Sequence, residues 1–377
     1  MIDALHHYFN FNSFRPGQED VIRAILSGRD CLVTMPTGAG KSLCFQLPAL
    51  IQGGLCVVIS PLISLINDHV ISLRQYGIRA TCLTSQQDIH TQTIIKHHIR
   101  QESVSFLYIS PEKFATNEIF TLLRNVTIHS FVIDEAHCAS HRGHDFRPEY
   151  HQITVYKKFF PSVPFIAMTA TADAMTRADI IKQLGLTNVW EYHAPAIRPH
   201  LSLDIITGEK KNAHLLTFLS QVTDSGIVYC GSRARVNSLL ALAHHHGISC
   251  LGYHAGMDTQ TRQRNDERFR RNECLVMIAT IAYGMGIDKH DIRRVYHYTM
   301  PRSIEAYYQE TGRAGRDGQP ARAVMTANQG DVSLHAHMIR RTGGPMQEYR
   351  LTKLARMWDF VKIPAHERAD FLCQYFR

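Results

Sequence analysis

Short apolar runs alternate with longer mixed segments along most of the chain, and this pattern restricts the fold more than any other feature. Runs that are almost continuously apolar are typical of parallel strands covered by helices on both faces. We therefore expect two α/β halves, each built on a parallel sheet. The expected strands are 30–34, 55–60, 106–109, 130–133 and 165–168 in the first half and 201–206, 226–230, 250–253, 274–279, 294–298 and 321–326 in the second.

Two changes in this pattern predict domain boundaries. Segment 194–199 contains two prolines, which favour extended backbone. Near 328–331 the pattern becomes helical and stays so to the end. A chain of 377 residues is long enough for two or three domains. We predict three, comprising 1–197, 198–330 and a helical segment 331–377.

The charge balance and the composition narrow the functional class. The formal net charge is +8 with all 23 histidines counted as neutral, and this excess favours a polyanionic partner. No stretch approaches the roughly 18 apolar residues of a membrane span, and the N-terminal residues do not read as a secretory signal. We therefore expect no membrane partner and a cytoplasmic protein, associated with the nucleoid if the chain is bacterial. The nine cysteines contain no C-x-x-C pair, which predicts buried free thiols in a reducing compartment.

The sharpest local signal is Met-Pro-Thr-Gly-Ala-Gly-Lys-Ser at 35–42, directly after an expected strand and before a helical pattern. Its glycines allow backbone N–H groups to surround phosphate oxygens, and the N-terminus of the following helix adds a favourable field. Lysine can reach the terminal phosphates of ATP, and the serine is the expected Mg²⁺ ligand. A glycine turn that only opens a helix is the alternative, and the strand context disfavours it. The predicted binding residues are Thr37, Gly38, Ala39, Gly40, Lys41 and Ser42.

A second signal is an apolar strand that ends in two carboxylates, Asp134 and Glu135. Asp134 would hold Mg²⁺ directly or through water, and Glu135 would orient or deprotonate the attacking water. The pair is weak alone and becomes strong because the phosphate loop lies upstream. The nearby His137 and His141 could suggest another metal site, but no further pair completes a closed zinc site.

Other segments gain meaning from their order around these two signals. Gln18, just after Arg15, has an amide that can read the edge of adenine. The helix start after Ser60 and Pro61 could present N–H groups to a phosphate backbone. The hydroxyls in 169–171 could couple a nucleotide pocket to a DNA track, although a simple helix cap explains them equally well.

In the second half, Arg313 and Arg316 lie three residues apart, and we expect them to share a helix face. Guanidinium groups suit the charge that develops on a transferred phosphoryl group. A solvated basic turn is the alternative. It is disfavoured by the glycine-rich segment 279–289, which follows a strand and suits close approach to a nucleic-acid backbone and to an interdomain cleft.

Taken in order, these motifs resemble the RecQ family of superfamily-two DNA helicases over nearly all of residues 1–330. The most specific marker is Gly-His-Asp-Phe-Arg-Pro-Glu-Tyr at 143–150, following Asp-Glu-Ala-His-Cys at 134–138. It looks like the aromatic-rich loop of that family, which couples single-stranded DNA binding to ATP hydrolysis. Segments 253–257 and 305–311 also match the family closely.

The resemblance implies an α/β fold of two RecA-like parallel-sheet domains in tandem with a short C-terminal helical segment. It also implies ATP and Mg²⁺ as cofactors, and 3′-to-5′ unwinding of single-stranded and forked or tailed duplex DNA in recombination and repair. We expect a monomer. The alternative is a DNA-stimulated ATPase, a translocase or a DNA-binding protein with little or no unwinding.

The resemblance also assigns residues to three roles. Those implied in nucleotide binding, beyond the phosphate loop, are Arg15, Gln18, Gly286 and Asp288. The implied catalytic residues are Lys41, Asp134, Glu135, Gln309, Arg313 and Arg316, with the arginines completing the site from the second lobe. The implied DNA contacts are Ser60, Pro61, His144, Asp145, Phe146, Arg147, Thr169, Thr171, His254 and Thr280.

The sequence departs from the family in two places. The aromatic-rich loop has His141 and Arg142 where the family usually carries Gln-Trp, so a cation replaces a stacking ring and the coupling is expected to change. Segment 353–376 resembles the start of the family's zinc-binding subdomain, and the chain stops before the clustered cysteines. His366, which aligns with the first zinc ligand, and Cys373 cannot form a four-ligand site alone, so we expect no structural zinc.

Overall fold

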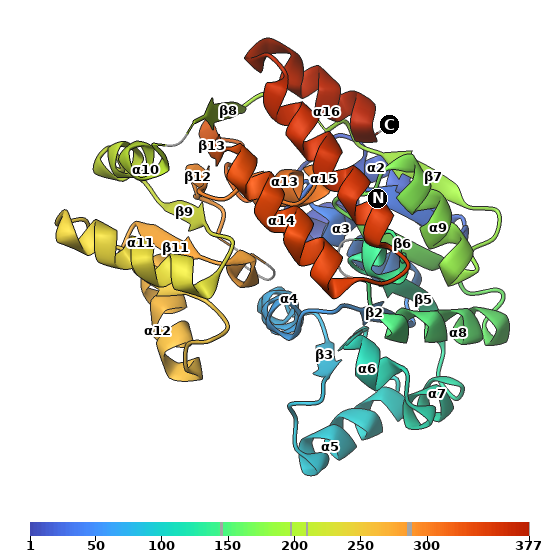
Figure 1. Cartoon of the computed structure of the whole chain (residues 1–377). Helices are drawn as coiled ribbons and strands as arrows, with labels where there is room; N and C mark the ends of the chain where they lie inside the picture. Colours follow the sequence, from blue (N-terminus) through green and yellow to red (C-terminus); the bar gives the residue numbers. More distant parts are fainter. Residues whose placement is uncertain (144–145, 197, 209, 285–288, 377) are drawn as a thin grey trace. The chain divides into compact units, whose positions relative to one another are not determined.

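The structure is a computed structural model that describes residues 1–143, 146–196, 198–208, 210–284 and 289–376. The chain divides into two compact units, which consist essentially of Met1–Pro195 and Ala196–Tyr375 (Figure 1). Each unit is an α/β structure with its own parallel sheet. The predicted pair of parallel-sheet halves is confirmed.

The first unit contains a seven-stranded sheet in the order β3-β4-β2-β5-β6-β1-β7, and every pairing in it is parallel. All five strands predicted for this half are present. The two that the sequence did not reveal, β3 and β7, are the edge strands, and β7 alternates between half-buried and exposed residues instead of reading as one apolar run. The strands are β1 (Cys31–Thr34), β2 (Leu55–Ile59), β3 (Ala80–Leu83), β4 (Phe106–Ile109), β5 (Ile128–Ile133), β6 (Phe165–Thr169) and β7 (Trp190–His193).

Helices cover both faces of this sheet because successive strand residues point to opposite sides. Along β2, Cys56 and Val58 belong to the core that packs against the first four helices, α1 (Ile2–Phe9), α2 (Gln18–Leu26), α3 (Lys41–Gln52) and α4 (Ile63–Gln75). Leu55, Val57 and Ile59 belong to the core of the other face. The elements on that face are α5 (Ile89–Arg100), α6 (Pro111–Phe114), α7 (Asn117–Leu123), the 3₁₀ helices η1 (Ala136–Ala139) and η2 (Pro148–Gln152), α8 (Ile153–Phe159) and α9 (Ala174–Leu184).

The second unit contains a six-stranded sheet in the order β10-β11-β9-β12-β13-β8, again entirely parallel. All six strands predicted for this half are present. They are β8 (Leu201–Thr207), β9 (Gly226–Tyr229), β10 (Leu251–Tyr253), β11 (Val276–Ala279), β12 (Arg294–His297) and β13 (Ala321–Ala327).

Helices α10 (Lys211–Ser220) and α11 (Arg233–His245) cover one face of the second sheet, and α12 (Thr259–Arg270) covers the other. The 3₁₀ helix η3 (Ile281–Tyr283) and α13 (Ile304–Thr311) follow β11 and β12. The predicted helical end is present as α14 (Gln329–Thr342), α15 (Gln347–Lys362), η4 (Ala365–Glu367) and α16 (Arg368–Phe376). Helices α14 and α15 lie side by side (Figure 1).

The cysteines are all free, and seven of the nine are buried, so the predicted buried thiols are confirmed for most of them. Burial raises the pKa of several of these thiols, for example that of Cys56 to about 12, which keeps them protonated and unreactive. Within the described part of the chain, no helix combines the length and apolarity needed to cross a bilayer. Nor do three or more His, Cys, Asp or Glu side chains of those residues form a group that could hold a metal ion.

Candidate active site

The candidate active site lies along the edge of the first sheet that is formed by the carboxyl ends of four neighbouring strands. Strands β2, β5, β6 and β1 are consecutive in the sheet and parallel, so the segments that follow them meet at their carboxyl ends. Ligands of open parallel sheets bind at this edge. The converging segments are Ser60 after β2, Asp134 and Glu135 after β5, 169–171 at the end of β6 and the phosphate loop after β1.

The phosphate loop is held open by its glycines and from outside by two polar side chains. Gly38 and Gly40 have φ values of 86° and 82°, a region that residues with a side chain rarely adopt. Arg15 Nη1 donates a hydrogen bond to the Gly38 carbonyl at 2.5 Å. Gln18 Nε2 donates to the Gly40 carbonyl at 3.1 Å, while Gln18 Oε1 accepts from the Arg15 N–H at 2.8 Å. The predicted nucleotide residues Arg15 and Gln18 therefore contact the loop directly.

Helix α3 begins immediately after this loop and has no side-chain cap at its N-terminus. The first N–H groups of such a helix have no partner within the helix and favour an anion. Lys41, its first residue, donates from Nζ to the Met35 carbonyl at 3.0 Å across the loop, and Ser42 follows it in the first turn. Backbone N–H groups, one ammonium and one hydroxyl thus lie together, and this donor set fits the phosphates of a nucleotide.

The carboxylate of Asp134 lies beside this loop in a polar network. Ser60 Oγ donates to Asp134 Oδ2 at 3.0 Å, and the Glu135 N–H donates to Asp134 Oδ1 at 2.9 Å. Burial, with a smaller contribution from the negative charge of Glu135, raises the pKa of Asp134 to about 6, while the ammonium of Lys41 opposes this rise. A buried carboxylate with a raised pKa fits a site for a divalent cation. Mg²⁺ prefers carboxylate oxygen, and the positive charge of a bound Mg²⁺ would restore the ionised form of Asp134.

Glu135 has a strained backbone and a defined set of neighbours. Its φ and ψ are both 47°, which is the left-handed region and costs a non-glycine residue on the order of 1 kcal/mol or more. The carboxylate lies 3.3 Å from Nδ1 of His137, and the same nitrogen lies 3.0 Å from Thr169 Oγ1. Although burial lowers it, the pKa of His137 is raised above its ordinary value by Cys138 and Glu135. A chain of polar contacts therefore joins β5 to β6.

Three of the residues predicted to contact DNA in this unit have buried side chains. Ser60, Thr169 and Thr171 are each at most 2% exposed. The Ser60 N–H already donates to the Ile109 carbonyl, and Pro61 has no N–H. The N–H groups that remain for a phosphate at this point are those of the first turn of α4, which has no side-chain cap. A nucleic-acid contact here would therefore involve backbone N–H groups, as we expected from the sequence. The assignment of Ser60, Thr169 and Thr171 as DNA contacts stays a prediction.

The segment that resembles the aromatic-rich loop carries a group of rings in tilted and edge-on contact. Phe146 lies 4.1 Å from the ring of His141 and 5.7 Å from that of His151 between centroids. Arg147 Nη1 contacts Glu112 Oε1 at 3.5 Å. His144 and Asp145, which the resemblance places in the DNA contact, lie outside the described residues. His141 therefore takes part in a ring cluster at the position where the family usually has Gln.

In the second unit, the prediction that Arg313 and Arg316 share a helix face is wrong. Helix α13 ends at Thr311, and both arginines lie in the turn that follows, where Gly315 has a left-handed φ of 63°. The C-cap of α13 is Gly312, with a right-handed φ of −60°, and the left-handed Gly315 keeps the following turn from continuing as a helix. Burial raises the pKa of Tyr229 to about 12 although the guanidinium groups of Arg313 and Arg316 oppose the rise. The two arginines therefore approach the same tyrosine.

The other site residues predicted in the second unit lie in different environments. Gln309 is half-buried on α13. His254 is buried, with Nε2 at 3.1 Å from Asn237 Oδ1, so its ring is fixed by the protein. Thr280 is half-buried and precedes η3. The predicted Gly286 and Asp288 lie outside the described residues.

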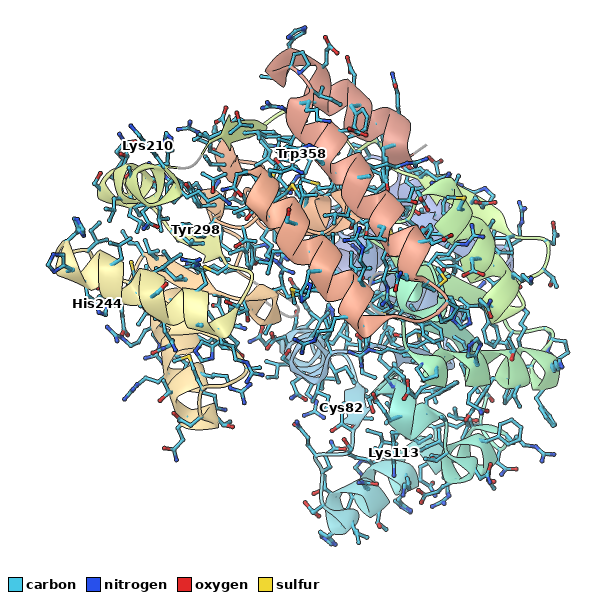
Figure 2. All side chains as sticks on the ribbon, viewed as in Figure 1. Cys82, Lys113, Lys210, His244, Tyr298 and Trp358 are labelled. Atoms are coloured by element: carbon cyan, nitrogen blue, oxygen red, sulfur yellow. The ribbon has the colours of Figure 1, made fainter. Side chains whose placement is uncertain are left out.

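The second unit also contains a cavity of about 540 Å³ that the sequence reasoning missed. It lies where β9, β12 and β13 end and where α10, α11 and α14 begin, so three helix N-termini adjoin it. Lys211 and Asp331 form a buried ion pair there, and Arg235 lies over the ring of Tyr298 at 5.4 Å. Lys210 and Tyr298, two of the lining residues, are labelled in Figure 2. Gly-Ser-Arg at 231–233, directly after a strand, was the signal that could have revealed it.

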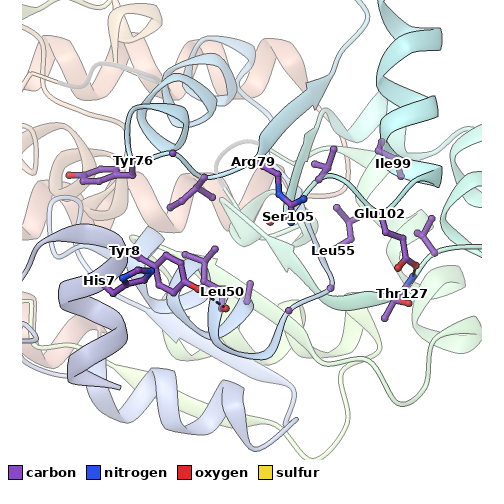
Figure 3. Close-up of a pocket in the computed structure, with 17 residues that line it drawn as sticks. His7, Tyr8, Leu50, Leu55, Tyr76, Arg79, Ile99, Glu102, Ser105 and Thr127 are labelled. Atoms are coloured by element: carbon purple, nitrogen blue, oxygen red, sulfur yellow. Dashed lines mark hydrogen bonds between the residues drawn. The ribbon is translucent and has the colours of Figure 1, made fainter.

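A further cavity of about 560 Å³ lies in the first unit at the opposite ends of the strands (Figure 3). Its lining includes Leu55, the first residue of β2. It also includes Ser105, just before β4, and Thr127, just before β5. Arg79 and Glu102 are the charged residues among its walls. It is therefore separate from the carboxyl edge that holds the phosphate loop and the carboxylates.

Two domain families match the chain. The family described as "DEAD/DEAH box helicase" matches residues 15–180, and "Helicase conserved C-terminal domain" matches residues 210–318. The solved structure of Dbp5 from S. cerevisiae bound to RNA and ADP BeF3 is similar with a TM-score of 0.69 at 18% identity, covering 100% of this chain and 96% of that one. These findings define the class: the protein has the two RecA-like α/β domains of a helicase core, with a C-terminal helical segment.

Within that class the chain is similar to DNA helicases of the RecQ family. It is 43% identical over its whole length to the "ATP-dependent DNA helicase RecQ" of Pasteurella multocida and 43% identical to the protein of that name from Haemophilus influenzae. The chain spans about 60% of the length of these two relatives.

Proposed function

We propose that the protein is an ATP-dependent DNA helicase of RecQ type that moves 3′-to-5′ and unwinds DNA in recombination and repair. The observation that carries this proposal is the carboxyl edge of the first sheet. There the phosphate loop and its lysine follow β1, and the Asp134–Glu135 pair follows β5, with only β6 between these two strands in the sheet. The names of its RecQ relatives support the same activity. Its substrates would be single-stranded and forked or tailed duplex DNA.

In this proposal, the first unit binds and hydrolyses ATP. Backbone N–H groups of the phosphate loop and Lys41 hold the phosphates, and Gln18 reads the adenine edge from its place against the loop. Ser42 and Asp134 would hold Mg²⁺, which neutralises charge on the phosphates when it is bound. Glu135 orients the attacking water and accepts its proton, since its carboxylate is fixed beside His137.

The second unit is proposed to contribute Gln309, Arg313 and Arg316 to the same reaction. Guanidinium groups suit the charge that develops on a transferred phosphoryl group, and removal of such a group typically lowers kcat strongly. Gly286 and Asp288 are proposed for the nucleotide on the resemblance alone. We expect Arg313→Gln to lower kcat for ATP by 100-fold or more, on the order of 3 kcal/mol in the barrier, with little change in ATP affinity.

DNA is proposed to follow both units. Phe146 and Arg147, both half-buried, would contact the single strand in the first unit, since a ring and a cation are what a base and a phosphate require. In the second unit, His254 and Thr280 are proposed from the resemblance. The cavity beside Arg235 adds the N-terminus of α10, which has no side-chain cap, and the Arg235 guanidinium, and both suit a backbone phosphate.

The decisive experiment follows ATP turnover and strand separation in the same reactions. Substrates are a duplex with a 3′ single-stranded tail, the same duplex with a 5′ tail and an RNA duplex. Lys41→Ala removes the ammonium of the phosphate loop, and Lys158→Ala, an exposed lysine on α8, is the matched control. We expect unwinding only of the 3′-tailed DNA, lost in Lys41→Ala and kept in Lys158→Ala.

Other outcomes would change the proposal in defined ways. ATP turnover that DNA stimulates without strand separation would remove the helicase activity and leave a translocase or a DNA-stimulated ATPase. Unwinding of the RNA duplex at a similar rate would overturn the preference for DNA. Turnover that survives in Lys41→Ala would overturn the site itself. The domain division into 1–197, 198–330 and 331–377 and the monomeric state are further proposals, which limited proteolysis and sedimentation of the same preparation test.

A further inference from the structure

The turn that follows α13 is held by one guanidinium group. Helix α13 ends at Thr311, and the carbonyl groups at and beyond this end lack the partners that further turns of helix would supply. Arg198 Nη1 donates a hydrogen bond to the Gly312 carbonyl at 2.9 Å. Arg198 Nη2 donates to the carbonyls of Ala314 and Gly315 at 2.9 and 3.0 Å. One planar side chain therefore fixes three carbonyl groups of a segment that is neither helix nor strand.

Two of these carbonyl groups belong to the peptide groups that lead into the arginines proposed for phosphoryl transfer. The Gly312 carbonyl shares a peptide group with the Arg313 N–H. The Gly315 carbonyl shares one with the Arg316 N–H. Because a peptide group is planar, a carbonyl that is held in place also sets the direction in which the chain enters the next residue. Arg198 therefore restrains the backbone of both arginines.

Arg198 is itself held by the residues on either side of it along the chain. Its Nη2 lies 3.4 Å from Nε2 of His200, and that ring nitrogen lies 3.0 Å from the Gly315 carbonyl. Two residues before Arg198, the Ala196 carbonyl accepts a hydrogen bond from the Tyr308 hydroxyl of α13 at 3.2 Å. The start of the second unit is thus attached to α13 and to its turn at two further places, which keep the guanidinium in position.

The charge of Arg198 has no carboxylate partner among the described residues. The side chain is half-buried, and burial lowers its pKa, with a smaller opposing contribution from Tyr308. An arginine side chain nevertheless stays ionised in proteins, and backbone carbonyls give it charge-assisted hydrogen bonds. A neutral side chain at this position would avoid the cost of removing a charge from water. The placement of the turn therefore explains this arginine better than stability does.

We infer that Arg198 is a positioning residue that orients Arg313 and Arg316 for phosphoryl transfer from ATP. The inference rests on the proposed function, because it needs these two arginines to act on the nucleotide. Arg198 acts through its three hydrogen bonds to the turn and needs no contact of its own with ATP.

The test is Arg198→Gln, which removes the guanidinium fork and keeps a polar side chain. Arg368→Gln is the matched control, because Arg368 lies buried in the same unit and also donates to backbone carbonyls, those of Ile363 and Leu203, at 3.0 Å each. For each variant, kcat and KM for ATP are measured at saturating single-stranded DNA, together with the melting temperature. Arg198→Lys keeps the positive charge without the planar fork. Arg198→Gln is also combined with Arg313→Gln.

We expect Arg198→Gln to lower kcat about tenfold, which corresponds to about 1.4 kcal/mol in the barrier, because small displacements of a catalytic group are costly. KM for ATP should stay within about twofold of wild type. Arg368→Gln should lower the melting temperature comparably and leave kcat at the wild-type value. Arg198→Lys should recover only part of the loss, since one ammonium does not reproduce the fork. In the Arg313→Gln background, Arg198→Gln should cost less than about threefold, because one of the groups that it positions is already absent.

Equal kcat values for Arg198→Gln and Arg368→Gln would overturn the inference and leave the proposed function intact. An undiminished loss of about tenfold in the Arg313→Gln background would overturn it as well, because the effect would not then pass through the arginine turn. Complete recovery by Arg198→Lys would show that charge alone matters, and it would also overturn the positioning role. If Arg313→Gln itself leaves kcat unchanged, then the proposed catalytic role of the turn fails, and the inference fails with it. The Arg313→Gln measurement therefore separates the two failures.

Discussion

Asp134→Asn should make the ligand-free protein more stable while it abolishes ATP turnover. The folded protein raises the pKa of this carboxyl from 3.8 to about 6, mainly because the group is removed from water. A shift of about two units corresponds to about 3 kcal/mol, because each unit is about 1.4 kcal/mol. At pH 7.5 the ionised carboxylate therefore opposes folding. Asparagine removes the charge and can keep the contacts with Ser60 and the Glu135 N–H.

The sign of the effect gives it a distinctive pH dependence. Because the pKa is higher in the folded than in the unfolded protein, the stability that comes from protonation is fully present below about pH 4. It is lost as the pH rises through about 6. The advantage of Asp134→Asn should therefore be largest above pH 7 and should fade towards pH 5, where wild-type Asp134 is protonated.

Scanning calorimetry of the full chain without nucleotide or Mg²⁺ measures this difference. A gain of roughly 1–3 kcal/mol should raise the melting temperature by about 3–10 °C, since one kcal/mol corresponds to about 2–4 °C in a unit of this size. Asp179→Asn is the control of opposite sign. Although partial burial raises it, the pKa of Asp179 is lowered below its ordinary value by its hydrogen bonds with Ser140 and Gln183, so this change should lower the melting temperature. If Asp134→Asn melts at or below the wild-type temperature at pH 7.5, the claim that ionised Asp134 opposes folding is refuted.

Three further changes test other parts of the first and second units. Asp30→Ala should lower the free energy of unfolding by about 3–5 kcal/mol in a denaturant titration, because the Lys157 ammonium and two backbone N–H groups lose the carboxylate that accepts their hydrogen bonds. Adding Lys157→Met to this variant should restore part of the lost stability. Gly40→Ala should weaken ATP binding by tenfold or more in calorimetry, since the added Cβ would lie 2.4 Å from Nε2 of Gln18, which holds the phosphate loop. Gly28→Ala has a similar positive φ in open space, and it should leave ATP binding unchanged. Arg235→Gln should weaken DNA binding and reduce the slope of log K against log salt by about 0.7 in a fluorescence titration; an unchanged slope would exclude a phosphate contact.

Much of the fold could be predicted from the sequence because parallel sheets leave a strong local trace. Central strands such as β2 and β4 are covered on both faces, so they read as continuous apolar runs. Of the two missed strands, β7 lacks this cover, whereas β3 is mostly buried but reads as a short mixed Ala-Thr-Cys-Leu run. The residues of β7, for example Glu191 and His193, are exposed in alternation, and such a run is not distinguishable from a loop without its partner strand.

The candidate site was predictable where its chemistry lies in one stretch of sequence. The phosphate loop and the Asp134–Glu135 pair each follow a strand directly, so their placement at the same edge follows from the parallel sheet. Contacts between distant segments were not predictable. Neither the bond from Tyr150 to the Asp134 carbonyl nor the one from Ser60 to Asp134 has a local signature. Arg313 and Arg316 were placed on a helix because three-residue spacing is typical of one, and the glycines that end α13 were given too little weight.

The energetics of the first sheet distinguish its active edge from the rest of the unit. Asp30 is a buried carboxylate with a lysine and two backbone N–H donors, and its contacts are those of a structural residue. Asp134 is also removed from water, yet its pKa is raised, and the next residue has a strained backbone. Helix α3 begins beside it without a side-chain cap. Each of these features destabilises the ligand-free protein, and each becomes favourable with a phosphate and a divalent cation at the same edge. Their coincidence at one place is explained by function, because stability alone would have selected contacts like those of Asp30.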